Sequence, residues 1–238
     1  MAEAKEIRGF VIKQQQLGEA DILLTFFSQE QGKTRMVIKA AKRVTSKLQS
    51  ALQPYYLSQV SLVGKGELQN VISSQVLESY AGVLQTEIGM RLVSVVQEFL
   101  YRALPDEQVN TQLFNLVLEF YKLLNNHQDL DFSQGQALVV QFYSLALLAI
   151  GLNPESNLVI LEEPKEVFLS NQEGGFAIQR RSVSDIALPT EAYKEYLKLS
   201  KQPMVINVLD NQELLTAILG FVNYQLERKF IAGEYFLT

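Results

Sequence analysis

The sequence has no cysteine and only one histidine, His127. A disulfide framework is therefore impossible, and the chain cannot build a zinc site from cysteine and histidine ligands. The absence of cysteine is consistent with a reducing cytoplasm. Nothing else in the sequence indicates a cofactor, and none is expected.

A long uninterrupted apolar run is also missing. The longest apolar stretch, residues 137–150, is interrupted by Gln141 and is shorter than the roughly 20 residues that a membrane span requires. Residues 1–8 carry charges of both signs and no apolar run follows a basic start, so they do not resemble a secretory signal. We therefore expect a cytoplasmic protein that does not associate with a membrane.

Positive charge is scarce overall but unevenly distributed. The net charge is −5 over 238 residues, yet residues 1–80 hold ten Lys and Arg against seven Asp and Glu, a net of +3. Residues 81–238 therefore carry a net of −8. Because the average hides this asymmetry, we expect the two parts of the chain to face different partners.

The first eighty residues alternate between apolar, β-rich runs and turn signals. The predicted strands cover residues 7–13, 21–28, 35–41, 55–63 and 68–77. The breaks fall near Gly18, near Gly32, around residues 45–50 and at Gly64-Lys65-Gly66. Five short strands in this length predict a small barrel, and the five-stranded OB-fold is the common nucleic-acid-binding barrel of this size.

After residue 80 the apolar residues recur with the period of a helix. The predicted helices cover residues 80–104, 109–124, 133–150, 190–199 and 211–228, and the third is apolar almost all round. Residues 153–189 are predicted to form an irregular arm with two short β-like pieces at 166–169 and 176–179. The sequence thus predicts an α+β protein: an OB-fold barrel in residues 1–80 and a helical domain with an inserted arm in residues 81–238.

A basic cluster is the most informative local feature. Residues 33–47 contain six cations and no acid. Cations on one strand and its following loop are typical of a surface that tracks a phosphate backbone rather than one that reads bases. An exposed sheet edge protected by lysines is the alternative. The candidate nucleic-acid-binding residues are Lys33, Arg35, Lys39, Lys42, Arg43 and Lys47.

Aromatic residues that could stack on bases are few. Tyr55-Tyr56 and Phe26-Phe27 are the candidates. Adjacent residues in a strand point to opposite faces, so we expect at least one member of each pair to lie in the core.

Catalytic motifs are weak. Gly32-Lys33-Thr34 resembles the end of a phosphate-binding P-loop, but Phe27 stands where the motif needs glycine and a strand follows instead of a helix. His127 has no serine or cysteine partner at a suggestive spacing and is expected to be a surface histidine at a helix end. The carboxylate pairs at 129/131 and 162/163 are expected to be solvated. The chain is not expected to be an enzyme.

Several short motifs resemble the N-terminal domain of the RecO family in order and spacing. They are Gly18-Glu19-Ala20-Asp21, Leu23-Leu24-Thr25, Gly32-Lys33, Lys39-Ala40-Ala41-Lys42-Arg43 and Leu52-Gln53-Pro54. Residues 76–80, 148–154 and 227–230 extend the resemblance over most of the chain.

The resemblance implies a DNA repair and recombination mediator associated with the nucleoid. Members of the family bind single- and double-stranded DNA, anneal complementary strands without ATP, and act with RecR and the single-strand DNA-binding protein. It assigns the DNA backbone to the six cations named above and implies no small-molecule substrate. The family often holds a four-cysteine zinc site in the arm, but residues 158–181 contain no cysteine. The arm is therefore expected to be held by packing.

Two other functions remain open from the sequence. In the first, the barrel has lost DNA binding and the protein is an interaction module, which the acidic composition allows. In the second, carboxylates of the helical domain belong to an enzyme active site, which would require a pocket with perturbed pKa values.

Overall fold

The computed structural model describes residues 4–39, 47–64, 68–152, 154 and 164–237. The chain divides into two compact units. The first comprises Met1–Gln85 with Val96–Gln128, and the second comprises Thr86–Val95 with Asp129–Thr238. The domain boundary placed after residue 80 by the sequence stays a prediction, and residues 96–128 group with the barrel.

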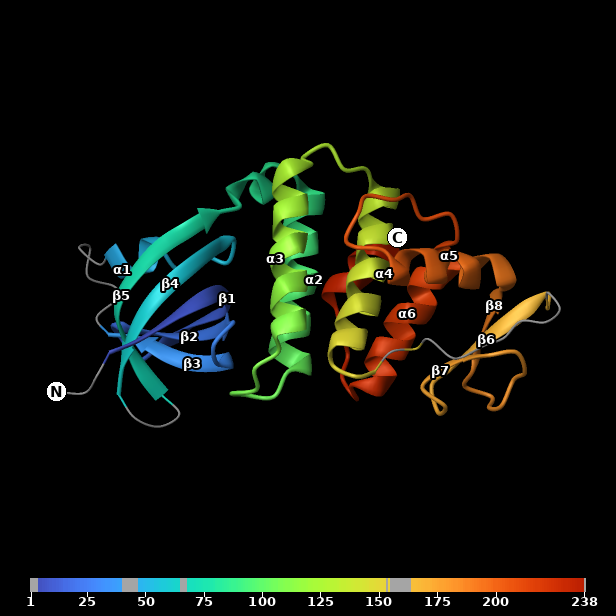
Figure 1. Ribbon diagram of the computed structural model, residues 1–238, viewed down its shortest axis with the longest axis horizontal. Coiled ribbons are helices and arrows are strands. Elements are labelled where there is room, and N and C mark those ends of the chain that lie inside the picture. Colours follow the sequence, from blue (N-terminus) through green and yellow to red (C-terminus); the bar gives the residue numbers. More distant parts are fainter. Residues whose placement is uncertain (1–3, 40–46, 65–67, 153, 155–163, 238) are drawn as a thin grey trace. The chain divides into compact units, whose positions relative to one another are not determined.

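A closed five-stranded barrel forms most of the first unit (Figure 1). Its strands are β1 (Lys5–Leu17), β2 (Asp21–Ser28), β3 (Gly32–Ile38), β4 (Tyr56–Val63) and β5 (Leu68–Ser79). The order around the barrel is β1-β2-β3-β5-β4, and β3 and β5 are the parallel pair. This is the predicted OB-fold. The third strand begins at Gly32, three residues before the predicted start.

The barrel interior is filled by side chains that alternate along the strands. Val11, Phe26 and Met36 are each no more than 1% exposed and belong to one apolar cluster. Leu52 joins this cluster from the segment after the short helix α1 (Lys47–Ser50). Because inward and outward positions alternate in a strand, the residues between these side chains form the outer face of the barrel.

Two helices accompany the barrel in the first unit. The predicted helix 80–104 is divided into a 3₁₀ turn, η1 (Ala81–Gln85), and α2 (Glu87–Ala103), whose residues from Val96 onward belong to this unit. The hydroxyl of Thr86 accepts from the backbone N–H of Gly89, which marks the start of α2. The next helix, α3 (Thr111–Asn126), begins at Asn110, whose side chain accepts from the backbone N–H of Leu113 at 2.8 Å.

The second unit is built around α4 (Phe132–Ala149). This helix is buried on nearly all sides, as its sequence predicts, and packs against α5 (Thr190–Lys201), α6 (Gln212–Gln225) and the 3₁₀ turn η2 (Ala232–Leu237). Asp131 and Gln134 form a capping box at its start. No helix in the described part of the chain is long and apolar enough to cross a membrane.

The arm is more regular than its sequence suggests. Three short strands, β6 (Glu166–Ser170), β7 (Gly175–Ala177) and β8 (Ile186–Pro189), form an antiparallel sheet in the order β7-β6-β8. The two predicted β-like pieces, residues 166–169 and 176–179, correspond to β6 and β7, whereas β8 was not predicted. Its four residues end in proline, a residue that disfavours a strand except at a sheet edge, which is where β8 lies. The ring of Phe176 packs on Tyr193 and Tyr196 of α5, with centroids 4.8 Å from each.

Gly32 begins β3 at a point where two backbone segments come very close together. Its φ is +70°, and a Cβ there would lie 2.0 Å from the carbonyl oxygen of Gln108. Gly18, at the β1–β2 turn, has φ +62°, but a Cβ at that position would have nothing within 4 Å. The two glycines share a left-handed conformation and differ only in their surroundings.

We predict that Gly18→Ala lowers the free energy of unfolding by about 1–2 kcal/mol, the cost of a left-handed conformation for alanine. Gly32→Ala should cost about 1–3 kcal/mol more, because the backbone at Gln108 must also move. Urea unfolding followed by circular dichroism measures both. Equal losses for the two variants would contradict a close approach between Gly32 and Gln108.

Candidate nucleic-acid interface

The outer face of β1, β2 and β3 carries side chains in rows that cross the three strands. Residues paired across neighbouring strands project from the same face. A bulge in β1 between Val11 and Lys13 adds one residue, which places Lys13 on the same face as Phe10. Two adjacent rows result, the covered row of Phe10, Phe27 and Lys33 and the cationic row of Lys13, Thr25 and Arg35.

The covered row lies beneath α3. Phe10 stacks on Tyr121 with ring centroids 4.8 Å apart, and Phe27 packs against Phe114 at 5.8 Å. Phe10 and Phe27 are fully buried. The hypothesis that Phe26 or Phe27 stacks on a base is therefore wrong, because Phe26 fills the barrel core and Phe27 is covered by the helix.

Lys33 ends the covered row and caps α2. Its ammonium group donates to the carbonyl oxygens of Tyr101, at 3.1 Å, and Leu104, and lies 3.2 Å from Oδ1 of Asp106. The last carbonyls of a helix have no partners within the helix and carry its negative dipole end, so a cation there is stabilising. Only 11% of the Lys33 side chain is exposed. Its charge is engaged within the protein by two backbone carbonyls and one carboxylate.

Arg35 lies in the cationic row and points to solvent. Its Nη2 is 2.8 Å from Oδ2 of Asp106, and 56% of its side chain is exposed. Burial acts to raise the pKa of Asp106, but hydrogen bonds and charges from Arg35 and Lys33 outweigh it, so that pKa lies below its usual value. One carboxylate thus holds two neighbouring cations of β3.

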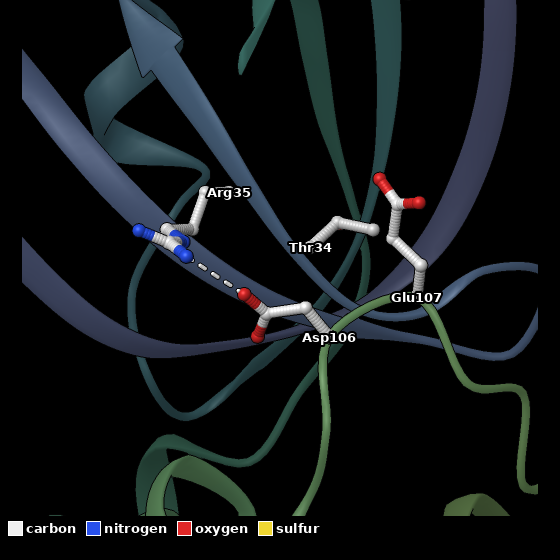
Figure 2. Close-up of a pocket in the computed structure, with 4 residues that line it drawn as sticks. All are labelled: Thr34, Arg35, Asp106 and Glu107. Carbon is white, nitrogen blue, oxygen red and sulfur yellow. Dashed lines mark hydrogen bonds and ion pairs between the residues drawn. The ribbon is translucent and has the colours of Figure 1, made fainter. Parts of the chain in front are cut away.

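A shallow cavity of about 150 Å³ opens beside this ion pair. It is lined by Thr34, Arg35, Asp106 and Glu107 (Figure 2). The guanidinium of Arg35 is directed toward Asp106, whereas the carboxylate of Glu107 points away from that pair. The backbone N–H of Glu107 donates to the carbonyl of Lys33 at 2.8 Å, which holds the loop after α2 against the edge of β3.

Sequence reasoning missed two residues of this surface, Lys13 and Tyr101. The ammonium group of Lys13 lies 4.0 Å from the centroid of the Tyr101 ring, and that of Lys33 lies 5.8 Å from it. A hydrogen bond with Lys13, together with the charges of Lys13, Lys33 and Arg35, lowers the pKa of Tyr101 against the opposing effect of burial. The two residues are 88 positions apart in sequence, so no local pattern could join them.

The remaining predicted site residues follow β3. Lys39 is exposed in the turn directly after the strand. Lys42 and Arg43 lie outside the described residues. Lys47 begins α1, and its side chain is not among those described. The structure therefore brings Lys33 and Arg35 together at Asp106, and the prediction that the six cations bind DNA stays a prediction.

The other candidates have local roles. Tyr55 and Tyr56 contact each other edge to face at 4.8 Å, and both are half-buried. His127 is the exposed C-cap of α3, with Nδ1 2.9 Å from the carbonyl oxygen of Leu123, as predicted for a helix-end histidine.

Of the carboxylates, Asp131 caps α4, and residues 162 and 163 lie outside the described part. Among described residues, no group of three or more His, Cys, Asp and Glu is placed to hold a metal ion.

Lys33 and Arg35 provide a matched test of structural against surface roles. Lys33→Met should lower the free energy of unfolding by about 1.5–3 kcal/mol, because the carbonyls of Tyr101 and Leu104 and the carboxylate of Asp106 lose a charged partner. Arg35→Met should cost less than about 1 kcal/mol, since its ion pair is exposed. Urea unfolding of both variants measures the difference, and a larger loss for Arg35→Met would contradict the helix-capping role.

The lowered pKa of Asp106 predicts a pH-dependent contribution to stability. A carboxylate whose pKa is lower in the folded than in the unfolded state stabilises the fold above its unfolded pKa. That contribution is lost as the pH falls through the folded pKa. The stability difference between the native protein and Asp106→Asn should be constant from about pH 6 to 8 and shrink below about pH 4. Unfolding curves at each pH test this, and a difference that grows in acid would refute it.

Comparison with known proteins finds similar sequences for the barrel and for most of the chain. The family described as "Recombination protein O N terminal" matches residues 1–80. A protein of Thermodesulfovibrio yellowstonii is 26% identical over 198 residues, covering 81% of this chain and 77% of its own length. One from Dehalococcoides mccartyi is 23% identical over 235 residues, covering 93% and 90%. One from Heliobacterium modesticaldum is 29% identical over 161 residues, covering 67% and 56%.

Each of these three relatives is named DNA repair protein RecO. The matched segment contains all five strands of the barrel, and the longer matches continue through the helices. The chain is therefore similar to DNA repair protein RecO of several bacteria, through the barrel and through the helices that follow it.

Proposed function

We propose that this protein is a DNA repair and recombination mediator that binds DNA on the outer face of β1, β2 and β3. Its relatives are named as DNA repair proteins, and the family model matches residues 1–80, which contain the barrel strands. The proposed activity is annealing of complementary strands without ATP and loading of a recombinase together with RecR. No covalent step is involved, so no catalytic residue is required.

The cationic row is the observation that carries the proposal. Lys13 and Arg35 lie on either side of Thr25, on the sheet face next to the row that α3 covers. Neighbouring strands are about 4.8 Å apart, so the two cations rise from backbones separated by roughly 10 Å. Cations spaced across a face neutralise successive phosphates and position a strand without reading its bases.

We propose a revised membership of this site, based on the contacts of each cation. Lys33 is left out because its ammonium group caps α2, and Lys13 enters because it shares a row with Arg35. Lys39 continues the surface directly after β3. The proposed phosphate contacts are Lys13, Arg35, Lys39, Lys42, Arg43 and Lys47.

Capture of strands by charge explains annealing without an energy source. Two complementary strands repel each other through their phosphates, and a cationic surface that holds one strand reduces that repulsion for the second. Residues 81–238 carry a net charge of −8 and are the proposed contact region for RecR and the single-strand DNA-binding protein. Like charges would oppose DNA binding over most of this region, apart from the end of α2 that Lys33 holds beside the barrel.

Binding of a fluorescent single-stranded oligonucleotide across a salt series tests the proposal. The triple variant Lys39→Glu, Lys42→Glu and Arg43→Glu should bind more weakly than the native protein. Its plot of log affinity against log salt should be shallower by about 2, because each neutralised phosphate contributes about 0.7 for single strands.

The control is Lys194→Glu, Lys198→Glu and Lys201→Glu, which changes the net charge equally on the exposed side of α5. It should retain the native salt dependence. If native protein and the barrel variant bind equally poorly at low salt, the DNA proposal is wrong, and the protein is an interaction module instead.

A further inference from the structure

Tyr101 occupies an unusual position for an aromatic residue of a packed helix. Its neighbours Phe99 and Leu100 are at most 1% exposed, whereas Tyr101 is 37% exposed. The backbone carbonyl of Tyr101 accepts from Lys33, which attaches this turn of α2 to β3. The helix therefore holds the Tyr101 ring beside the outer face of the barrel, at the border between the covered row and the cationic row.

Two ammonium groups lie near this ring. Lys13 lies 4.0 Å from the ring centroid and Lys33 lies 5.8 Å from it. Arg35 acts on the same tyrosine through its charge. A cation over an aromatic face is itself favourable, by about 0.5–1 kcal/mol at an exposed site. The packing of α2 does not require the Tyr101 ring to stay exposed beside Lys13 and Lys33.

An exposed aromatic ring bordered by cations is the combination that binds single-stranded nucleic acid. Base stacking on an aromatic side chain is tolerant of sequence, because every base offers a π-face, and adjacent cations hold the flanking phosphates. A paired base inside a duplex has both faces occupied by its neighbours. The ring would therefore distinguish an unpaired strand from a duplex, whereas the cations alone would not.

We propose that Tyr101 is a stacking residue for an unpaired base, with Lys13 and Arg35 holding the phosphates on either side of it. This inference rests on the proposed DNA-binding function and adds to it a preference for single strands. The binding energy then has two separable parts. The ring supplies a part that does not depend on salt, and the cationic row supplies a part that does.

Binding of a fluorescent single-stranded oligonucleotide and of its duplex to Tyr101→Leu tests the stacking role. Leucine keeps an apolar side chain and removes the π-face. Affinity for the single strand should fall roughly five- to hundredfold, the range for loss of one stacked base. Affinity for the duplex should change less than about twofold, and the salt dependence of both should stay native because no phosphate contact is lost.

Two matched variants separate stacking from damage to the fold. Tyr101→Phe retains the ring face and should bind the single strand like the native protein. Tyr224→Leu removes another exposed tyrosine, which is 48% exposed on α6, and should leave binding unchanged. An oligonucleotide of abasic residues keeps the phosphates without the bases, so the native protein and Tyr101→Leu should bind it equally.

A spectroscopic readout is also accessible because the chain contains no tryptophan. Tyr101→Trp introduces a single indole, whose fluorescence should be quenched by the single strand and not by the duplex. Salt-dependent binding of both DNA forms that is indifferent to Tyr101→Leu would overturn the stacking role and leave the proposed function intact. Absence of any salt-dependent DNA binding by the native protein would overturn both.

Discussion

A single buried ammonium group joins the barrel to its helices within the first unit. Lys33 extends from β3 to the open carbonyls at the end of α2 and to the carboxylate of Asp106. A helix end needs partners for its last carbonyls, and the strand supplies one that also opposes the helix dipole. The position of the loop after α2, and of the tyrosine one turn before it, depends on this contact. Lys33, which the sequence predicts as a DNA contact, thus has a structural role in this unit.

The outer face of β1, β2 and β3 is divided into a row covered by a helix and a cationic row. The covered row lies under α3, where Phe10 and Phe27 meet its aromatic residues. The cationic row begins immediately beyond, and the bulge in β1 brings Lys13 into it. The same strands therefore have two roles, since one part of the face packs against α3 and the other presents charge. The transition between them takes place over a single step of two residues along β2 and β3.

Much of the fold could be predicted from the sequence, because apolar residues recur with a different period in strands and in helices. All five barrel strands and the long helices were predictable in this way, and the start of β2 at Asp21 was predicted to the residue. The failures have a common cause. Strand β8 is only four residues long and gains its regularity from pairing with β6, which no local pattern reports.

The site was less predictable, for the same reason. The density of positive charge in residues 33–47 was visible in the sequence, but charge density does not show where each cation points. Burial of Lys33 depends on the end of α2, which lies 68 residues further along the chain at Tyr101. The pairing of Lys13 with Tyr101 likewise depends on tertiary structure. Local patterns identified the kind of surface, and the packing of α2 decided its members.

The ion pair between Arg35 and Asp106 has a consequence for how long DNA would stay bound. The carboxylate already occupies the guanidinium in the way that a phosphate oxygen would. A DNA strand that binds Arg35 would therefore displace Asp106 from the guanidinium. When the DNA dissociates, the Asp106 carboxylate would bind the guanidinium again. Exchange of this kind lowers the barrier to release. For the proposed function this would be an advantage, because a mediator that bound a strand too tightly would block its transfer to another strand.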